Sequence, residues 1–387
     1  MKNIVVITPI YKFLNRSDLK TDTQCVHDLL KYNFSNYNIK VVVPYRHQLK
    51  KIFTNSSINY LKFRKKGYDY NCEGISVSLV EWQNIYPKQS APLKINQNKF
   101  VKKIENKVEE ATSNPDLLIY HIPSFSMFIG EKLNYKCNSI AILHYSDVIY
   151  LKNNEKKFIN YLEKNFSEVY CRSKAIYEIF SKYSLKNLSD RIIYSGVNAS
   201  TDIKVESEKS NENKILYVGK LIARKNLELL IKTLGTINNY KWSLSIIGEG
   251  QIKNRCEKLV KNLKLENNIS FLGYMDKKEV YKNMQLSDIF CMPSIKETLG
   301  LVYLEAMANG NITIGTKNEG IDGIIIDDKN GFLVEPTMES LRETLIKIFD
   351  MTESERKKII ENAILTTKEF TEEKMSYNYF EIIEKNL

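Results

Sequence analysis

Short apolar runs rich in β-branched residues alternate along the chain with stretches in which apolar residues recur at helical spacing. The runs predict buried strands, and the stretches predict helices that cover them. In the first half we predict strands at Ile4–Pro9, Ile39–Val43, Ile75–Glu81, Leu117–His121, Ile140–His144, Glu168–Cys171 and Ile192–Tyr194. In the second half we predict strands at Ile215–Gly219, Ser243–Gly248, Ile269–Gly273, Ile289–Pro293, Ile312–Thr316 and, as a short edge, Phe332–Val334. Helices are predicted between them at Asn226–Leu234, Ile252–Leu263, Lys278–Met284, Leu301–Asn309 and Leu341–Phe349. This alternation predicts an α/β fold with parallel sheets covered by helices on both faces.

One polar segment interrupts the pattern. Residues 197–213 hold few large apolar side chains, and a predicted strand begins directly after them. Such a segment is typical of a linker between domains. We therefore predict an N-terminal domain at 1–196, a linker at 197–213 and a C-terminal domain at 214–371. A last helix at about 372–387 can pack on either domain, the first included.

Composition and charge narrow the functional classes. The chain has 387 residues, of which 43% are hydrophobic and 27% are charged, as in an ordinary globular protein. Its net charge of +11 is uneven, because residues 1–200 carry +13 and residues 201–387 carry −2. A basic first half points to an anionic partner such as a membrane surface, a nucleic acid or a phosphorylated substrate.

Signals for secretion or membrane insertion are weak. The apolar run at Ile4–Ile7 is short and is followed by Pro9, so we interpret it as a buried strand and not as a signal peptide. No run reaches the ~18 apolar residues that a transmembrane helix needs. The six cysteines are scattered along the chain. We expect them to be reduced, which favours the cytoplasm.

The basic residues gather in one segment. Between Lys40 and Lys66 there are eight Lys and Arg residues and no Asp or Glu, with aromatic residues interleaved. A solvated loop or helix face explains this segment as well as docking on anionic lipid does. Docking would make the protein peripheral at the inner face of the cell membrane. A nucleic-acid interface is the weaker interpretation, because no known nucleic-acid-binding module is present.

The clearest candidate chemistry lies between a predicted strand and the helix that follows it. Glu297 precedes Gly300 in this turn, and Glu305 lies eight residues after Glu297, within the helix. The first amides of a helix have no intrahelical acceptor and carry a positive partial charge, so they can seat a phosphate. A carboxylate on each side can accept hydrogen bonds from sugar hydroxyls. The arrangement predicts a site for a nucleotide-linked sugar.

Further candidates follow other strands of the same domain. Lys220, Arg224 and Lys225 come after the strand that ends in Gly219, and Tyr274 follows the third strand. The three cations can stabilise a departing diphosphate, although taken alone they are explained more simply as solvated residues at a helix start. Ligands bind at the carboxyl ends of parallel strands, so these turns should share one edge of the sheet.

Together these motifs show a resemblance between the second half of the chain and a known domain. The second half resembles the donor-binding domain of a family 4 glycosyltransferase of the GT-B fold. The resemblance rests on the Gly219-Lys220 turn, Gly248–Gly250, the motif from Glu297 to Glu305 and the segment Asn330–Val334. It implies two Rossmann-like domains whose parallel sheets face a central cleft, and we therefore predict that the N-terminal domain binds the acceptor and the C-terminal domain binds the nucleotide sugar. It also implies sugar transfer with retention of the anomeric configuration.

The resemblance assigns a role to each matching position. It implies that Glu305 holds the nucleotide ribose, that Glu297 contacts the donor sugar, and that Lys220 and Lys225 contact the diphosphate. The family usually has arginine where this chain has Lys220. The sugar and the distal phosphate would meet the backbone amides around Leu299, Gly300 and Leu301.

The first domain offers two candidate histidines, His121 and His144, each at the end of a predicted strand. The family places an important histidine of this domain near the donor sugar. We favour His121 and keep His144 as the alternative, although a lone histidine is more often structural. Arg172 also ends a strand, and a salt bridge explains it equally well. The family's glycine-rich loop after the first strand is absent, since residues 9–23 contain no glycine.

We therefore predict a retaining glycosyltransferase that moves a sugar from a nucleotide-sugar donor, with UDP as the expected nucleotide, to a lipid-linked or cell-surface polysaccharide acceptor. No metal or other cofactor is expected, because the lysines and the helix terminus would stabilise the departing diphosphate. Three alternatives remain: a non-catalytic glycan-binding partner subunit of a transferase, a nucleotide-sugar epimerase on the same scaffold, and a polyanion-binding protein.

Overall fold

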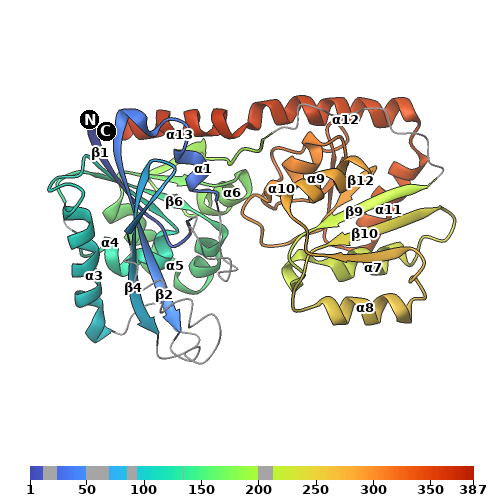
Figure 1. Cartoon of the computed structure of the whole chain (residues 1–387), viewed down its shortest axis with the longest axis horizontal. Helices are drawn as coiled ribbons and strands as arrows, with labels where there is room; N and C mark the ends of the chain where they lie inside the picture. Colours follow the sequence, from blue (N-terminus) through green and yellow to red (C-terminus); the bar gives the residue numbers. More distant parts are fainter. Residues whose placement is uncertain (12–23, 49–68, 85–93, 134, 199–211) are drawn as a thin grey trace. The chain divides into compact units, whose positions relative to one another are not determined.

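The computed structural model describes residues 1–11, 24–48, 69–84, 94–133, 135–198 and 212–387. The chain divides into two compact units, whose elements are labelled in Figure 1. The first unit contains residues 1–172, 176–193 and 375–387, and the second contains residues 173–175 and 194–374. Helix α13, Glu372–Asn386, therefore belongs mostly to the first unit. The predicted linker falls largely on residues 199–211, which lie outside the described residues.

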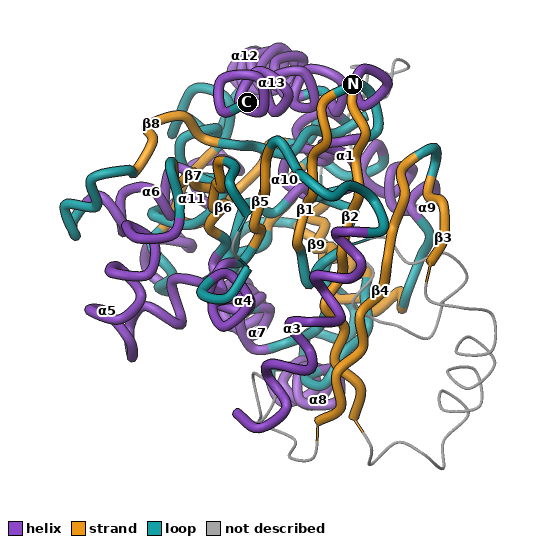
Figure 2. The backbone as a smooth tube through the Cα atoms, turned by 90° about the vertical axis from the view of Figure 1, so that its left-hand side faces the viewer, coloured by secondary structure: helices purple, strands orange, loops and turns teal. Residues whose placement is uncertain are grey.

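The described part of the first unit forms an eight-stranded sheet in the order β3-β4-β2-β1-β5-β6-β7-β8, and Figure 2 shows this succession across the view. The strands are β1 Lys2–Ile7, β2 Tyr37–Gln48, β3 Asp69–Cys72, β4 Ile75–Asn84, β5 Leu117–His121, β6 Asn138–Leu143, β7 Glu168–Cys171 and β8 Leu188–Ile192. All neighbours are parallel except β3 and β4, which form an antiparallel hairpin. Its two turn residues, Glu73 and Gly74, have φ of +51° and +92°. Positive φ at both positions is typical of tight hairpin turns.

Helices cover both faces of this sheet. They are α1 His27–Leu30, α3 Lys94–Glu109, α4 Pro123–Gly130, α5 Tyr145–Asn165, α6 Lys174–Ser181 and α13. On one face, Leu118 and Tyr120 of β5 belong to the same buried cluster as residues of α3, α4 and α5. Strand side chains alternate between faces, so Ile119 and His121 point to the other side. The hydroxyl of Ser376 in α13 donates to Leu29 O of α1 at 2.9 Å, which joins these two helices.

The described part of the second unit forms a six-stranded parallel sheet in the order β11-β10-β9-β12-β13-β14. Its strands are β9 Asn213–Val218, β10 Trp242–Ile247, β11 Ile269–Gly273, β12 Ile289–Cys291, β13 Ile312–Thr316 and β14 Phe332–Val334. Its helices are α7 Leu227–Leu234, α8 Lys253–Asn262, α9 Lys277–Gln285, α10 Leu301–Ala308, α11 Met338–Asp350 and α12 Glu353–Thr367. The prediction of two parallel-sheet α/β domains is confirmed.

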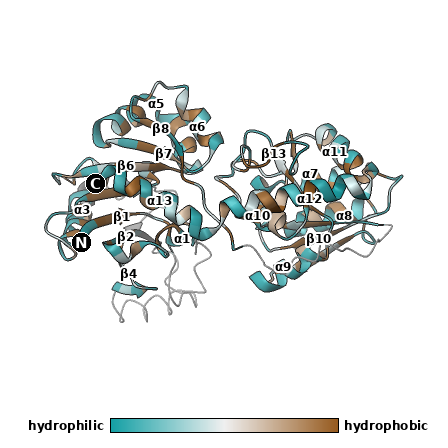
Figure 3. Cartoon of the chain, turned by 90° about the horizontal axis from the view of Figure 1, so that it is seen from above, coloured by the Kyte–Doolittle hydropathy of each residue, from teal (hydrophilic) through white to brown (hydrophobic). Residues whose placement is uncertain are grey.

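Burial explains why these elements form. Strand β13 is buried at every position, whereas α8 buries only Cys256 and Val260. Hydrophobic and hydrophilic residues accordingly alternate around the helices (Figure 3). Within the described residues, none of the helices combines the length and the apolar character that crossing a membrane requires.

Two sequence predictions need correction. The strand predicted at Ile192–Tyr194 is instead β8, Leu188–Ile192, because this edge strand is half-exposed and no apolar run marks it. The basic segment was interpreted as a solvated loop, a helix face or a membrane-docking surface, yet its start lies within β2. Lys40 is only 9% exposed, and its ammonium donates to Ser76 Oγ at 3.1 Å. Lys40 therefore cannot serve as a docking residue, and residues 49–66 lie outside the described part of the chain.

Candidate functional site

The second sheet brings two turns together where its strand order reverses. Strand β9 lies between β10 and β12. Strands β10 and β11 follow on one side of β9, and β12, β13 and β14 follow on the other side. Ligands of open parallel sheets bind at such a switch point, beyond the carboxyl ends of the strands. The turn after β9 contains Gly219–Lys225, and the turn after β12 contains Ser294–Gly300. These two turns hold most of the predicted donor-site residues.

Close backbone packing shapes the first of these turns. A Cβ atom on Gly248 would lie 2.0 Å from the carbonyl oxygen of Gly219, and one on Gly250 would lie 2.2 Å from that of Leu221. Gly248 also has φ of +139°, which L side chains rarely adopt. The loop after β10 therefore rests directly on the backbone of the turn after β9, and glycine is required at both contacts.

Glu297 is the centre of a buried charge cluster. Its Oε2 accepts hydrogen bonds from the Lys225 ammonium, from Arg224 Nη1 at 3.2 Å and from Ser294 Oγ at 3.1 Å. The side chains of Lys225 and Glu297 are each 11% exposed. The structure thus brings together three predicted residues, with both cations coming from the turn after β9 and the carboxylate from the turn after β12.

Burial and pairing act against each other in this cluster. Burial alone would raise the pKa of Glu297, but the Lys225 ammonium beside it holds that pKa below its ordinary value. Burial also lowers the pKa of Lys225, although the Glu297 carboxylate opposes this effect. The carboxylate is therefore charged at neutral pH, and its charge is what makes a buried Lys225 ammonium tolerable.

Glu319 holds the turn that presents Glu297. Its Oε2 accepts a hydrogen bond of 2.8 Å from the Glu297 backbone amide. A Cβ atom on Gly320 would lie 2.5 Å from the amide nitrogen of Leu299, so the segment after β13 packs on this turn. Burial raises the pKa of Glu319. We did not predict this role, because a glutamate in a loop carries no sequence signal for a contact with a turn 22 positions away.

The turn ends at the first residues of α10. Gly300 caps the helix with φ of +81° and no side-chain hydrogen bond, and Leu301 is the first helical residue. The side chain of Leu299 is buried at 4% exposure. A Cβ atom on Gly300 would lie 2.5 Å from the Tyr303 ring, whose hydroxyl donates to Met292 O at 2.6 Å. The packing of Gly300 on Tyr303 therefore fixes the position of the turn that carries the predicted backbone amides.

Glu305 lies further along α10 and has a separate set of partners. Its Oε1 accepts a hydrogen bond of 3.1 Å from the Tyr281 hydroxyl and pairs with the Lys277 ammonium at 3.2 Å. Burial, together with the Glu305 carboxylate, raises the pKa of Tyr281 to about 12. Both partners come from α9 and line a hollow of about 500 Å³. Asp276 caps α9, so a capping signal in the sequence could have shown that Lys277 and Tyr281 share a helix face.

Two predicted donor residues stand apart from these contacts. Lys220 is exposed, and it forms no ion pair with any residue that the structure describes. Tyr274 follows β11 and is 82% exposed. Both are available to a ligand, and neither side chain forms a hydrogen bond or an ion pair with the residues that the structure describes. Gly219 is half-buried and approaches Met292.

The two candidate histidines of the first unit are buried together. His121 Nδ1 lies 3.1 Å from His144 Nε2, and His121 Nε2 lies 3.1 Å from the hydroxyl of Tyr379 in α13. His121 is fully buried and His144 is 5% exposed. Burial and the nearby Arg172 guanidinium lower the pKa of both histidines well below the usual value. Both rings are therefore neutral at physiological pH.

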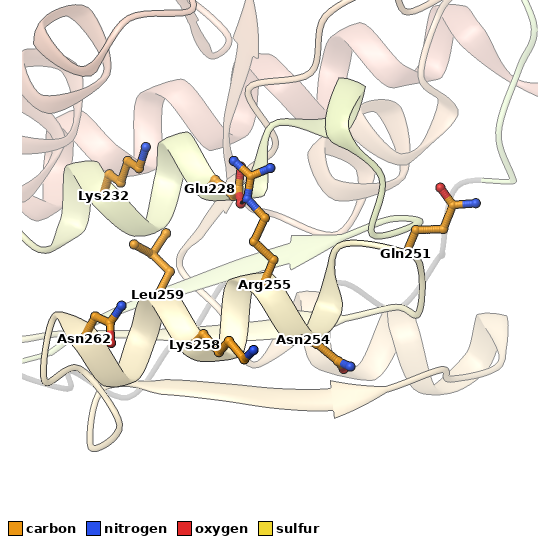
Figure 4. Close-up of a pocket in the computed structure, with 8 residues that line it drawn as sticks. All are labelled: Glu228, Lys232, Gln251, Asn254, Arg255, Lys258, Leu259 and Asn262. Carbon is orange, nitrogen blue, oxygen red and sulfur yellow. Dashed lines mark ion pairs between the residues drawn. The ribbon is translucent and has the colours of Figure 1, made fainter.

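A further hollow of about 560 Å³ lies between α7 and α8 (Figure 4). Its lining residues are Glu228, Lys232, Gln251, Asn254, Arg255, Lys258, Leu259 and Asn262. Arg255 pairs with Glu228 across it. It contains no predicted site residue and so is distinct from the Glu297 cluster.

Comparison with known proteins decides the family. Residues 198–366 match the family described as glycosyl transferases group 1. The chain is also 30% identical over 267 residues to an uncharacterised glycosyltransferase of Methanocaldococcus jannaschii, which covers 67% of this chain and 72% of that protein. The chain is a glycosyltransferase with a group 1 domain. In this glycosyltransferase the family match contains the Glu297 cluster and Glu305.

Two other similarities bear on the fold and on function. The glycosyltransferase is 25% identical over 217 residues to the alpha-monoglucosyldiacylglycerol synthase of Streptococcus pneumoniae, covering 50% of this chain and 49% of that protein. Its structure matches that of Anabaena HepE in complex with UDP, with a TM-score of 0.72, 16% identity and 100% of both chains covered. At this identity the second likeness concerns the fold alone, and it agrees with the predicted GT-B class.

Proposed function

We propose that this glycosyltransferase moves a sugar from a UDP-linked donor to a lipid-linked or cell-surface polysaccharide acceptor, with retention of the anomeric configuration. The observation that carries the donor assignment is the buried cluster of Glu297, Lys225 and Arg224 directly before the first turn of α10. The solved HepE complex contains UDP on the same fold, which supports UDP as the nucleotide.

Each part of the site then has a task. The first-turn amides of α10 and the ammonium groups of Lys220 and Lys225 bind the diphosphate. Glu297 accepts hydrogen bonds from the donor sugar, and Glu305 accepts them from the ribose hydroxyls. Tyr281 and Lys277 contact only Oε1 of Glu305 among the described residues, which leaves Oε2 for the ribose. We assign Arg224, the backbone amide of Leu299 and the exposed Tyr274 to donor binding as well.

The reaction replaces one bond at the anomeric carbon of the donor sugar with another. The acceptor hydroxyl oxygen bonds to the anomeric carbon from the side on which the diphosphate leaves. The bond between that carbon and the phosphate oxygen breaks, and its electron pair stays on the phosphate oxygen, which takes the proton of the acceptor hydroxyl. Lys220, Lys225 and the α10 terminus stabilise the developing negative charge, so no metal ion is required for this step.

The acceptor assignment rests on charge and on a relative. The first 200 residues carry +13, which favours an anionic surface or substrate. The name of the Streptococcus pneumoniae relative indicates a glycolipid product for that protein. We infer that this enzyme works at the cytoplasmic face of the membrane, on an acceptor anchored there.

Turnover tests this function directly. The purified chain is incubated with a panel of nucleotide sugars and with lipid-linked or polysaccharide acceptors, and product is followed by mass spectrometry and by NMR of the anomeric configuration. Lys220→Gln removes an exposed charge and so should spare the fold, yet should lower kcat by about 10- to 100-fold. Lys241→Gln is the matched control. Lys241 is also exposed, but it directly precedes β10 and so lies at the amino ends of the strands, opposite to the candidate site.

Transfer with retention from a UDP sugar, with a kcat that is lowered in Lys220→Gln and unchanged in Lys241→Gln, supports the proposal. An inverted product would refute the retaining mechanism. Conversion of the donor without change of mass and without acceptor would identify an epimerase. No turnover with any donor would favour a non-catalytic binding subunit.

A further inference from the structure

The outward side of helix α8 carries basic and amide side chains and no acidic ones. Between residues 251 and 262, every exposed side chain is Lys, Arg, Asn or Gln. Glu257 is the one acidic residue of this range, and it is half-buried, while Cys256 and Val260 face the core. The exposed positions within α8 share one side of the helix, in an arc of about 120°. The exposed residues of 251–262 are Gln251, Asn254, Arg255, Lys258, Lys261 and Asn262.

Helix α7 extends this surface. The exposed Lys232 of α7 lines the hollow of about 560 Å³ together with Arg255 and Lys258 of α8. Glu228 also lines this hollow, but it pairs with Arg255. Lys232, Lys258 and Lys261 form no ion pair with any residue that the structure describes. Lys232 and the exposed residues of 251–262 thus make a basic surface, although residues 201–387 carry −2 overall.

The shape of the basic surface suits an extended partner. Figure 4 shows Lys232, Lys258 and Gln251 spread along the two helices, without converging on one point. A small ligand is held by a few polar groups that converge on it, whereas a charged surface can meet cations that are spread out. The exposed residues of 251–262 include no aromatic side chain on which nucleic-acid bases could stack. Charge complementarity therefore favours a membrane that contains anionic phospholipid.

We propose that the basic surface of α7 and α8 docks on the phosphate headgroups of an anionic lipid membrane. The choice of a membrane rests on the proposed function, which places the acceptor there. Each lysine or arginine close to such a surface strengthens binding about fivefold. The amide groups of Asn254 and Asn262 can donate hydrogen bonds to phosphate oxygens. This surface belongs to the second unit, whereas the charge along the sequence pointed only to the first half of the chain.

Co-sedimentation of the full chain with lipid vesicles tests this surface. The wild-type chain should bind vesicles that contain phosphatidylglycerol and not vesicles of phosphatidylcholine alone, and added NaCl should weaken the binding. The triple variant Lys232→Gln, Lys258→Gln and Lys261→Gln should bind about 100-fold more weakly. Glutamine has nearly the same helix propensity as lysine, so exposed substitutions of this kind should keep the fold.

The matched control removes the same charge from the other side of the second sheet. Lys329, Lys358 and Lys368 are exposed on or beside α12. Figure 1 shows α12 and α8 on opposite sides of this sheet. The control variant Lys329→Gln, Lys358→Gln and Lys368→Gln should bind within about twofold of the wild-type chain, because salt screens distant charges.

Three results of this assay would overturn the inference. The first is equal weakening in both triple variants, because it would mean that only the net charge matters. The second is a wild-type chain that does not distinguish the two kinds of vesicle. The third is tighter binding of single-stranded RNA than of phosphatidylglycerol vesicles, which would indicate a nucleic-acid partner.

Hydrogen exchange of the wild-type chain locates the contact and depends on no variant. Peptides that cover α8 should exchange more slowly with phosphatidylglycerol vesicles and not with phosphatidylcholine vesicles. Binding without a change in α8 would place the docking surface elsewhere and would overturn the inference. Neither measurement uses a donor or an acceptor. If vesicles bind through α8 but no sugar is transferred, the proposed function fails and the docking surface stands.

Discussion

Replacing Glu297 with glutamine removes one charge from the buried cluster while keeping the shape of the side chain. Lys225 then loses the carboxylate that makes its charge tolerable, since its own side chain is only 11% exposed. Removing one partner of a buried pair costs about 3–5 kcal/mol. Arg224 remains nearby with a side chain that is 42% exposed, so it can turn to solvent. We expect a loss of about 3 kcal/mol, at the low end of that range.

A double-mutant cycle separates this interaction from other effects of the substitution. The free energy of unfolding is measured by urea for the wild-type chain, Glu297→Gln, Lys225→Met and the double variant, with the transition of the second unit followed through Trp242. The double variant should recover most of the loss, because it removes both charges. Glu228→Gln is the control. Its partner Arg255 is 73% exposed, so this pair should contribute at most about 1 kcal/mol.

The pH dependence of the free energy of unfolding tests the same interaction. The ordinary pKa of a glutamate is 4.5, and that of Glu297 is held below it in the folded chain. The stabilisation is therefore fully present above pH 4.5 and disappears as the pH falls through the depressed pKa. The difference between the wild-type chain and Glu297→Gln should shrink in that acidic window. A loss below ~1 kcal/mol at pH 7, or a double variant no more stable than the single one, would refute this reasoning.

Three further substitutions probe the rest of the site. Tyr281→Phe should raise the KM for the donor about three- to tenfold in steady-state assays, because Glu305 loses one of its two positioning contacts. An unchanged KM would contradict this role. Gly248→Ala should lower the stability of the second unit by at least ~2 kcal/mol in thermal unfolding, since its Cβ would strike the backbone of Gly219. Wild-type stability would mean that the two loops do not pack so closely. Glu319→Gln should lower kcat with little change in overall stability, because its carboxylate holds the turn before α10, and loss of stability without loss of kcat would contradict this.

Much of the second unit could be predicted from the sequence. Strand β13 and strand β14 have the predicted bounds, because apolar runs bounded by polar residues mark buried strands. Helix α10 starts at Leu301 as predicted, since Gly300 can adopt the positive φ that precedes it. In contrast, α12 was not predicted. Its buried residues are Ile359, Ala363 and Thr367, a stripe with too little apolar character to stand out.

The structure brings the predicted residues Glu297, Lys225 and Arg224 together, but their contacts, and the contacts made by Glu319, Lys277 and Tyr281, were not predicted. The spacing of Glu297 and Glu305 placed both on one turn and helix, yet nothing in the sequence showed that Lys225 would pair with Glu297. That pairing depends on the reversal of strand order, which brings two turns together across the chain. The bond between His121 and Tyr379 spans 258 positions and was equally beyond sequence reasoning. The sequence left His121 and His144 as alternatives, whereas the structure joins them.

Calorimetric titration with UDP tests the donor site most directly. The purified wild-type chain should bind one UDP, and Glu305→Gln should weaken binding about 10- to 100-fold, because the ribose loses a charged acceptor. Glu343→Gln, an exposed glutamate of α11, should bind as the wild-type chain does. Absence of UDP binding to the wild-type chain, or equal affinity of Glu305→Gln, would contradict the placement of the donor against α10.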